Sequence, residues 1–200
     1  GSDKIYDAAF AQGGIIRARD MEEFFDIGKA LAMQPPAMGK NIGILTDAGG
    51  PGVMTVDECE ALGLTVERFS EETLQKFQEL KDQNIILKIA ATSNPVDLTG
   101  SVTDDMFVMA ADLMFQDPQI CGIILLGLHH MPGLREVYID GIVKVAENYD
   151  KPIVMCDIGE TEMALYTRAR FDKLGVPSFE SPEDAARAMK ALVTYGSYLK

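Results

Sequence analysis

The chain has 200 residues, of which 47% are hydrophobic and 24% charged, a composition typical of a globular domain and unlike that of disordered or fibrous proteins. Its formal net charge of −13 repels phosphate backbones, so we do not expect nucleic acid as a partner. No apolar run approaches the roughly 20 residues of a membrane span and the first residues do not resemble a secretory leader, so we expect no membrane partner and predict a cytoplasmic location.

The first 34 residues predict an extension that precedes the main domain. Its expected elements are a helix over 3–14, a short strand over 15–18 and a helix over 19–33. In the second helix Asp20 is the expected N-cap, and Glu23 is placed to complete a capping box. Two prolines in residues 35–40 forbid helix continuation and indicate a linker. The sequence therefore predicts an α-β-α extension over 1–34 and a main domain over 41–200.

Short β-branched apolar runs predict five strands in the main domain. They cover residues 41–46, 64–69, 120–127, 152–157 and 175–179. Three of them, around Ile44, Ile124 and Val154, are apolar on both faces, as expected of central parallel strands covered by helices. Strands and helices alternate, which favours a flavodoxin-like, doubly wound, five-stranded parallel sheet with strand order 2-1-3-4-5.

Helical patterns with recognisable ends separate these strands. The first pattern starts at Pro51, and the other five cover residues 71–80, 104–115, 134–148, 161–175 and 182–195. Ser70, Thr103 and Ser181 are the expected N-caps of three of them. Pro51 and Gly63 mark the start and the end of the first, because proline suits a first helical turn and glycine a position just past the last.

The segment DAGGPG, residues 47–52, joins the first strand of the main domain to its first helix. Gly49, Gly50 and Gly52 carry no Cβ, so the backbone can come close to a ligand. The unpaired N–H groups of the first helical turn, with the positive end of the helix dipole behind them, suit an anion and above all a phosphate. The same glycines also suit a tight strand-to-helix turn, and the pattern matches neither the dinucleotide fingerprint nor the P-loop. Loop chemistry alone leaves both interpretations open.

Four segments together indicate a family. They are NIGILTDAGGPGV (41–53), SNPVDLTG (93–100), YDAAFAQGGIIRARDMEEFFDIGKAL (6–31) and LGVPSFESPEDAARAMKALVTY (174–195). In this order they resemble the NDP-forming (ADP-forming) acyl-CoA synthetases, relatives of succinyl-CoA synthetase, and the resemblance spans nearly the whole chain. It implies that residues 41–200 are the second flavodoxin-like ligase domain of such an enzyme and that residues 1–34 are the end of the first.

The resemblance also implies a reaction and its partners. An acid, CoA and a nucleoside triphosphate give an acyl-CoA, a nucleoside diphosphate and phosphate, and a histidine carries the phosphoryl group. The implied partners are a CoA-binding domain, the first ligase domain and an ATP-grasp module, fused or as subunits, with CoA, ATP and Mg²⁺ bound in those partners. A homo-oligomer is a further expectation.

The resemblance assigns phosphate binding to the start of the helix at Pro51. The implied backbone donors are Ala48, Gly49, Gly50, Gly52 and Val53. The phosphorylated histidine of the family lies upstream of the segment that matches residues 3–10, so no catalytic residue is expected in this chain. The chain alone is therefore expected to be inactive.

Further residues near predicted strand ends are candidates for the same site. His129, His130 and Gly133 follow the third strand, where the resemblance places a loop near the acid substrate, although surface or packing roles also fit them. Asp47 departs from the asparagine expected in the family. It is repulsive to phosphate unless protonated, turned away or offset by a cation, and it could instead cap the glycine junction. Asn94 and Asp97 are expected to support the glycine loop.

No metal site is expected. Asp157 and Glu160 could bind a cation, but Thr161 as a helix cap explains their segment more simply. Cys59, Cys121 and Cys156 lack ligand spacing and are all predicted to be core residues. The alternative function is a non-catalytic flavodoxin-like binding or regulatory module, such as an FMN carrier or a phosphate receiver. It has little support, because the ligand-end loops lack aromatic residues and Asp47 and Asp157 lie on separate strands.

Overall fold

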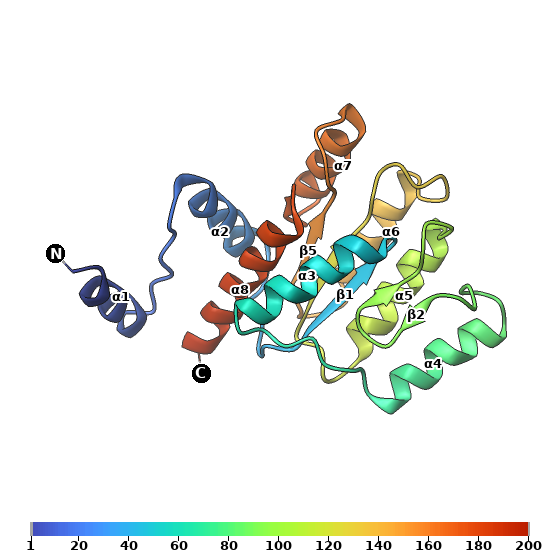
Figure 1. Cartoon of the computed structure of the whole chain (residues 1–200), viewed down its shortest axis with the longest axis horizontal. Coiled ribbons are helices and arrows are strands. Elements are labelled where there is room, and N and C mark those ends of the chain that lie inside the picture. The colour runs from blue at the N-terminus through green and yellow to red at the C-terminus, as the bar shows by residue number, and fades with distance from the viewer. Residues whose placement is uncertain (1, 200) are drawn as a thin grey trace.

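A central sheet of six strands organises the computed structural model, which describes residues 2–199. The strands are β1 Ile42–Thr46, β2 Ala91–Thr92, β3 Val96–Asp97, β4 Gly122–Leu126, β5 Ile153–Cys156 and β6 Ser178–Phe179. The helices are α1 Asp3–Gln12, α2 Met21–Met33, α3 Gly49–Ala61, α4 Glu71–Asp82, α5 Asp104–Gln116, α6 Val137–Ala146, α7 Glu162–Lys173 and α8 Pro182–Tyr198. The predicted α/β class is confirmed (Figure 1).

The sheet is mostly parallel, and its strand order is β2-β3-β1-β4-β5-β6. All neighbouring pairs are parallel except β2 with β3. Every residue of β1, β4 and β5 is buried, as their two-sided apolar sequences predict. The order β1-β4-β5-β6 agrees with the predicted order of the first, third, fourth and fifth strands. Because these strands are parallel, their carboxyl ends share one edge.

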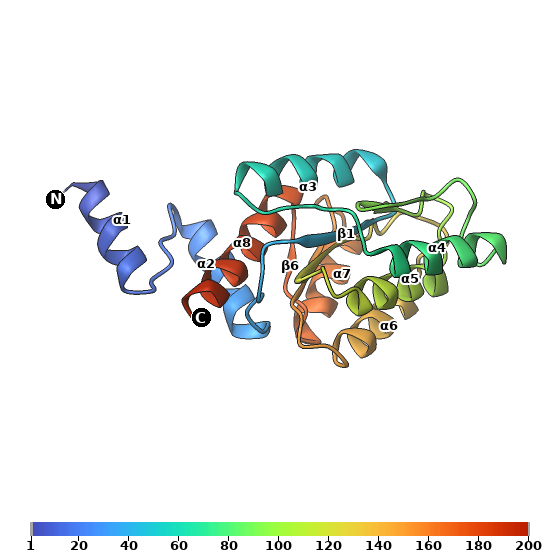
Figure 2. The same ribbon diagram turned by 90° about the horizontal axis from the view of Figure 1, so that it is seen from below.

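Helices cover both faces of the sheet, and each face has its own core (Figure 2). On one face Ile44 and Ile124 pack with Cys59 of α3 and Met189 of α8. On the other face, Leu45 and its neighbours pack with apolar side chains of the remaining main-domain helices. These include Phe77 of α4, Phe107 of α5, Tyr138 of α6 and Phe171 of α7. The alternate residues of each central strand therefore supply both cores.

The predicted second strand, residues 64–69, is wrong. This segment makes only one isolated bridge, between Thr65 and Asn41. β3 lies next to β1 instead, and β2 adds an antiparallel edge, so the sheet has six strands rather than five parallel ones. The Asn94 side chain fills the gap between the bridge and β3. Its Oδ1 accepts from the Ile44 N–H at 3.0 Å, and its Nδ2 donates to the carbonyls of Ile42 at 3.0 Å and Glu67 at 2.8 Å.

Most predicted helix caps are confirmed by a side chain that accepts from a backbone N–H. The capping residues are Asp20, Ser70, Thr161 and Ser181. Thr103 precedes α5 without such a bond, and the Glu23 carboxylate accepts from the Arg19 N–H rather than from the Asp20 N–H of a capping box. α3 begins at Gly49 and not at Pro51, so Pro51 is its third residue.

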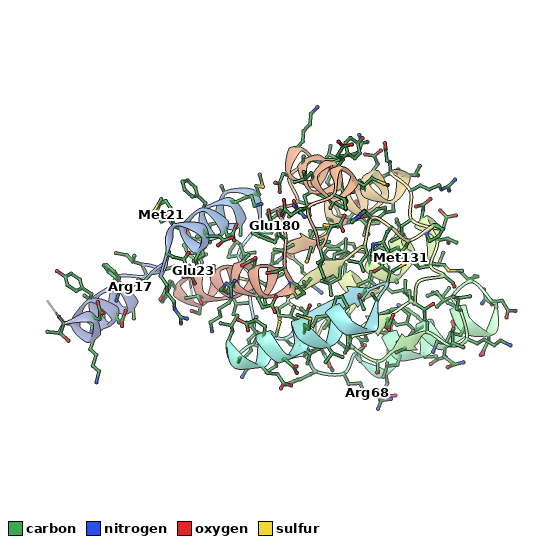
Figure 3. All side chains as sticks on the ribbon, turned by 45° about the horizontal axis from the view of Figure 1, so that its top comes forward. Arg17, Met21, Glu23, Arg68, Met131 and Glu180 are labelled. Carbon is green, nitrogen blue, oxygen red and sulfur yellow. The ribbon has the colours of Figure 1, made fainter. Side chains whose placement is uncertain are left out.

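The N-terminal extension differs from the prediction, since residues 15–18 form no strand. α1 buries none of its residues and projects from the main domain (Figure 1). Figure 3 shows Arg17 next to α1, far from Met131 in the main domain. α2 packs on α8 and buries Ile27 and Ala30. Of the three cysteines, Cys59 and Cys156 are core residues as predicted, but Cys121 is partly exposed. Residues 2–199 contain no helix that combines the length and the apolar composition of a membrane span.

Candidate functional site

Thr46, the last residue of β1, fixes the start of the glycine turn, residues 47–52. Its Oγ1 accepts from the Ala48 N–H at 3.0 Å and donates to the Ala48 carbonyl at 2.8 Å. A Cβ on Gly52 would lie 3.0 Å from Thr46 Cγ2, which is tighter than ordinary contact, so a larger residue would have to displace Thr46 slightly. Packing against Thr46 therefore favours glycine at position 52 independently of ligand binding.

Two amides at the start of α3 remain free. Three of the five predicted donors are already used. The Ala48 N–H donates to Thr46 Oγ1, and the Gly52 N–H donates to the Ala48 carbonyl at 3.2 Å. Val53 is the fifth residue of α3, so its N–H belongs to the hydrogen bonds within the helix. Gly49 and Gly50 are exposed, and within residues 2–199 their N–H groups have no partner. They lie at the carboxyl edge of the sheet, where the dipole of α3 leaves partial positive charge.

Asp47, the first residue of this turn, is buried, and its side chain is directed to the loop after β4 rather than to the start of α3. Its Oδ2 accepts from the Leu128 N–H at 2.8 Å, in the loop after β4, so it ties two neighbouring strand ends together instead of capping α3. Burial raises the pKa of Asp47 to about 7; the Leu128 hydrogen bond opposes this rise and the negative charges of Asp157 and Asp97 add to it. Asp47 Oδ1 is buried and has no hydrogen-bond partner within the described chain.

Asp97 lies on the other side of the glycine turn, at the end of β3. Its Oδ1 accepts from the Thr99 N–H at 2.8 Å, and its Oδ2 lies 3.0 Å from where a Cβ on Gly49 would be. Asn94, by contrast, contacts β1 and Glu67 rather than the glycine turn. The Asp97 side chain therefore lies beside Gly49, whereas the side chains of Asp47 and Asn94 are hydrogen-bonded elsewhere.

The loop after β4 contributes a hydrogen-bonded chain of three side chains. Asp157 Oδ1, at the end of β5, lies 2.8 Å from His129 Nδ1, and His129 Nε2 lies 2.8 Å from Thr161 Oγ1. Thr161 is also the N-cap of α7, where its Oγ1 accepts from the Ala164 N–H at 3.2 Å. Asp157 is fully buried; this raises its pKa, and the hydrogen bonds from His129 limit the rise. The position of His129 is thus fixed at both ring nitrogens.

The other two residues predicted for this loop have different surroundings. His130 is exposed and stacks edge-on against His129, with ring centroids 5.3 Å apart. A Cβ on Gly133 would lie 2.0 Å from the Val102 carbonyl oxygen, so only glycine fits this close approach. Gly133 therefore shapes the loop.

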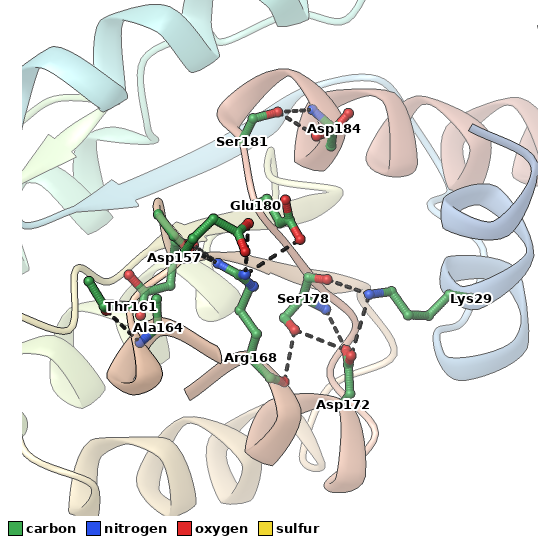
Figure 4. Close-up of polar contacts among 12 residues, drawn as sticks. Lys29, Asp157, Thr161, Ala164, Arg168, Asp172, Ser178, Glu180, Ser181 and Asp184 are labelled. Carbon is green, nitrogen blue, oxygen red and sulfur yellow. Dashed lines mark hydrogen bonds and ion pairs between the residues drawn. The ribbon is translucent and has the colours of Figure 1, made fainter. Parts of the chain in front are cut away.

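Arg168 of α7 is a buried cation that the sequence patterns did not single out. Its Nη1 donates to the carbonyls of Asp157 and Gly159, each at 2.7 Å, and so holds the exit of β5 against α7 (Figure 4). Its Nη2 makes no hydrogen bond within the described residues and lies 3.5 Å from Glu180 and 3.8 Å from Glu160. Asp157 and Glu160 therefore belong to this network, and residues 2–199 contain no cluster of ligands suited to a metal ion.

A cavity of about 570 Å³ lies next to His129, between α6 and α7. Its lining combines apolar and aromatic side chains with polar and charged ones: His129, Leu134, Arg135, Glu136, Tyr138, Ile139, Glu162, Met163, Tyr166 and Thr167. We call it the α6/α7 cavity. Sequence reasoning placed His129 near a ligand but missed this cavity and the partners of His129. The available signal was that residues just past adjacent parallel strands meet at one edge, as His129 after β4 and Asp157 after β5 do.

The exposed N–H groups of Gly49 and Gly50 suit an anion, and the His129 imidazole is held beside a cavity with both apolar and charged lining. Among residues 2–199, the glycine turn has no hydrogen-bonded pair of nucleophile and base. Such an arrangement suits electrostatic stabilisation of an anion more than covalent chemistry by these residues.

Comparison with known proteins gives a consistent result. Residues 42–191 match the family model of the ligase-CoA domain. The chain is 32% identical over 203 residues to subunit alpha of the ADP-forming acetate–CoA ligase II of Pyrococcus furiosus, and the match covers 96% of this chain and 42% of that protein.

Solved structures show the same similarity. The crystal structure of PH0766 from Pyrococcus horikoshii OT3 matches with a TM-score of 0.88 and 32% identity over 98% of this chain and 45% of that one. A dinucleotide-forming acetyl-coenzyme A synthetase 1 of Ca. Korarchaeum cryptofilum, solved with phosphate and ADP, matches with a TM-score of 0.88 and 27% identity over 100% of this chain and 43% of that one. The chain spans less than half the length of these relatives.

Proposed function

The chain belongs to the ligase-CoA domain family, and from this premise we propose that it is the second ligase domain of an NDP-forming acyl-CoA synthetase. The proposed reaction converts an acid, CoA and a nucleoside triphosphate into an acyl-CoA, a nucleoside diphosphate and phosphate. The observation that carries the proposal is the pair of exposed N–H groups at Gly49 and Gly50, which have no partner within residues 2–199. They suit a migrating phosphoryl group.

The role of these amides is electrostatic. Hydrogen bonds from Gly49 and Gly50 and the dipole of α3 would stabilise negative charge on phosphoryl oxygens without a side-chain acid or base. Asp97 beside Gly49 opposes an anion, whereas Asp47 is turned toward Leu128. A pKa of about 7 leaves Asp47 partly protonated at neutral pH, which reduces its repulsion. The turn thus offers two donors with the carboxylate of Asp97 nearby.

The remaining parts of the enzyme lie outside this chain in the proposal. A CoA-binding domain, a first ligase domain with the phosphohistidine and an ATP-grasp module would bind CoA, ATP and Mg²⁺, and this chain alone would not catalyse the reaction. The relatives support such partners, because this chain covers only 42% to 45% of their length. α1 buries none of its residues, and Phe24 and Phe25 of α2 are exposed, which suits the end of a preceding domain over residues 1–34.

The loop after β4 would face the acid substrate. His129 is held by Asp157 and Thr161, and Gly133 fits a turn that no larger residue could form. We assign His129 to substrate contact and Gly133 to loop shape. His130 belongs to the same loop, where it is exposed and its ring contacts the His129 ring.

Phosphate binding tests the proposed role of the glycine turn. Gly49→Pro removes one of the two free N–H groups, and the extended backbone of Ala48 can precede a proline in a first helical turn. We expect isothermal titration with inorganic phosphate to show about tenfold weaker binding for this variant, as for the loss of one hydrogen bond to a charged group.

Gly49→Ala is the matched control for this experiment. It places the same Cβ beside Asp97 but keeps the N–H, so it should bind phosphate nearly as well as the unchanged chain. Equal affinities of the proline variant and the unchanged chain would contradict the assignment of phosphate to these amides.

A further inference from the structure

Three side chains hold buried polar atoms that the proposed function does not use. The atoms are Asp47 Oδ1, Tyr138 Oη and Asp157 Oδ2, and none of them has a hydrogen-bond partner among residues 2–199. The three residues are 1%, 4% and 0% exposed. Buried polar groups of folded proteins are nearly always hydrogen-bonded, because an unpaired one costs free energy. If the three atoms lie together, one common partner can satisfy all of them.

The strand register places the two carboxylates in one row. β1, β4 and β5 are in register up to their last residues, Thr46, Leu126 and Cys156. Parallel pairing continues one residue further, where the Asp47 N–H donates at 3.3 Å to β4 and the Gly127 N–H at 3.2 Å to β5. Residues in register point to the same face of a parallel sheet, and alternate residues share a face. Asp47 and Asp157 therefore face the core that contains Leu45 and Tyr138, with Gly127 between them.

Both carboxylates are hydrogen-bonded to the residues that follow Gly127. Asp47 Oδ2 accepts from the Leu128 N–H at 2.8 Å. Asp157 Oδ1 accepts from the His129 N–H at 3.3 Å and lies 2.8 Å from His129 Nδ1. The two side chains are thus drawn toward β4 from opposite sides, and the second oxygen of each is held beside Gly127. Since glycine has no side chain, it leaves room between them.

Tyr138 of α6 reaches the same place. A Cβ on Gly127 would lie 3.0 Å from Tyr138 Oη, so the hydroxyl lies directly beside this glycine. The Tyr138 ring packs edge-on against Phe107 and Phe171, with ring centroids 5.7 Å apart in each pair. Burial raises the pKa of Tyr138 well above its usual value, and the charges of Asp157 and Asp47 add to this rise. The phenol therefore keeps its hydrogen and is a donor between two acceptors.

We propose that one internal water molecule is bound between Tyr138 Oη, Asp47 Oδ1 and Asp157 Oδ2. It accepts from the tyrosine hydroxyl and donates to both carboxylates, which gives the roughly three hydrogen bonds typical of a buried water. No two of the three atoms are hydrogen-bonded to each other, and a bridging water spans such a separation. The water completes a hydrogen-bonded chain from the glycine turn to the loop after β4, through Asp47, Asp157 and His129. Tyr138 is a positioning residue for both carboxylates.

Water fits this site better than a metal cation. The pKa of Asp47 is about 7, so its protonated and ionised forms both occur near neutral pH. Water can donate to the ionised form and accept from the protonated form, whereas a cation binds only the ionised one. Residues 2–199 also contain no group of three His, Cys, Asp or Glu side chains that could hold a metal ion.

A high-resolution crystal structure of the 200-residue chain tests the proposal directly. We expect a water molecule with all three oxygens at about 2.6 to 3.1 Å. A direct hydrogen bond between Tyr138 and either carboxylate, with no electron density between the three atoms, would overturn the proposal. Crystals grown with thallium(I) in place of sodium and potassium test for a cation. An anomalous peak between Asp47 and Asp157 would reject water as the occupant.

Tyr138→Phe removes the donor and keeps the ring. Loss of the hydrogen bond to the water should raise the equilibrium constant for unfolding in urea roughly fivefold to tenfold. Removal of a buried hydroxyl that has no partner would instead leave this constant unchanged or lower it, and either result would overturn the proposal. Tyr195→Phe is the control, because Tyr195 is exposed, and it should change the constant by less than about twofold.

Crystal structures of the same two variants separate positioning from a general effect on stability. The water should be absent from the carboxylates in Tyr138→Phe and present in Tyr195→Phe. A water that remains on both carboxylates of Tyr138→Phe would reject Tyr138 as its donor and with it the proposed site. The inference goes beyond the proposed function and does not depend on it, because these measurements do not involve phosphate binding at Gly49 and Gly50.

Discussion

At the residue scale, Asp47 shows how a carboxylate can lie beside an anion site. Its side chain is 1% exposed and accepts one hydrogen bond, from Leu128, while Oδ1 has no partner within the described residues. Burial of a charge with so little compensation favours the neutral form, which is why its pKa rises to about 7. The ionised form therefore costs stability, and an asparagine would keep the acceptor for Leu128 without the charge.

Asp47→Asn should change the pH dependence of stability. The pKa of Asp47 in the folded chain lies above its ordinary value of 3.8, so its stabilising contribution is complete below about pH 4 and is lost as pH rises through 7. Between pH 5 and pH 8 the unchanged chain should lose roughly 2 to 3 kcal/mol more of its free energy of unfolding than the variant. Urea unfolding at both pH values measures this difference.

Asp150→Asn is the control for the Asp47 prediction, because Asp150 is exposed and loses the same charge. It should leave the pH dependence unchanged. Parallel pH profiles for Asp47→Asn and the unchanged chain would show that Asp47 is fully ionised in the folded state, contrary to its burial.

Individual site residues were predictable from the sequence to different degrees. The position of Gly49 and Gly50 followed from the order strand, glycines, helix, and their N–H groups have no partner in the described part of the chain. The use of the Ala48 N–H by Thr46 could not be foreseen, because it depends on a side-chain rotamer. The predicted strand order brings the ends of β4 and β5 together, but the hydrogen bond between His129 and Asp157 also depends on loop and side-chain conformations that no sequence pattern specifies.

At the element scale, the partner of β1 on the side away from β4 is not one strand but two short segments, the bridge at Thr65 and β3. Residues 64–69 have the apolar alternation of a strand, but they use it for packing: Leu64 is buried in the core of α3 and α8, and Phe69 in the opposite core. Only Thr65 pairs with the start of β1. β3 has two residues and follows a proline, so no strand pattern could reveal it. Apolar periodicity predicts burial more reliably than pairing.

The side chain of Asn94 connects β1 to residues 64–69, so its removal should lower the free energy of unfolding. Asn94→Gly suits the positive φ of 89° but removes three hydrogen bonds to backbone groups of Ile42, Ile44 and Glu67. We expect a loss of about 2 to 4 kcal/mol in the free energy of unfolding, measured by urea denaturation.

Asn84→Gly is the matched control at this scale. Asn84 also has a positive φ, of 55°, and within residues 2–199 its side chain makes no hydrogen bond. This variant should be neutral within roughly 0.5 kcal/mol. If both glycine variants are equally stable, the Asn94 side chain does not hold β1 to residues 64–69.

At the scale of the whole molecule, one edge of the sheet holds both the glycine turn and the loop with His129. Asp47 links them through its bond to Leu128, so the phosphate donors and the cavity wall are fixed relative to each other. The family relationship and the parallel order of β1, β4, β5 and β6 were predictable, because they depend on segments with strong motifs or long apolar runs. The packing of α2 on α8 was not predictable, because the apolar pattern of a helix shows which face is buried but not which helix covers it.

The central claim is that the free amides of Gly49 and Gly50 bind phosphate, and a crystal structure of the chain grown with inorganic phosphate measures this directly. We predict a phosphate ion with oxygens about 2.7 to 3.1 Å from both nitrogens, in front of α3. A phosphate bound only elsewhere on the chain, or an empty glycine turn with both N–H groups bonded to Asp97, would contradict the claim.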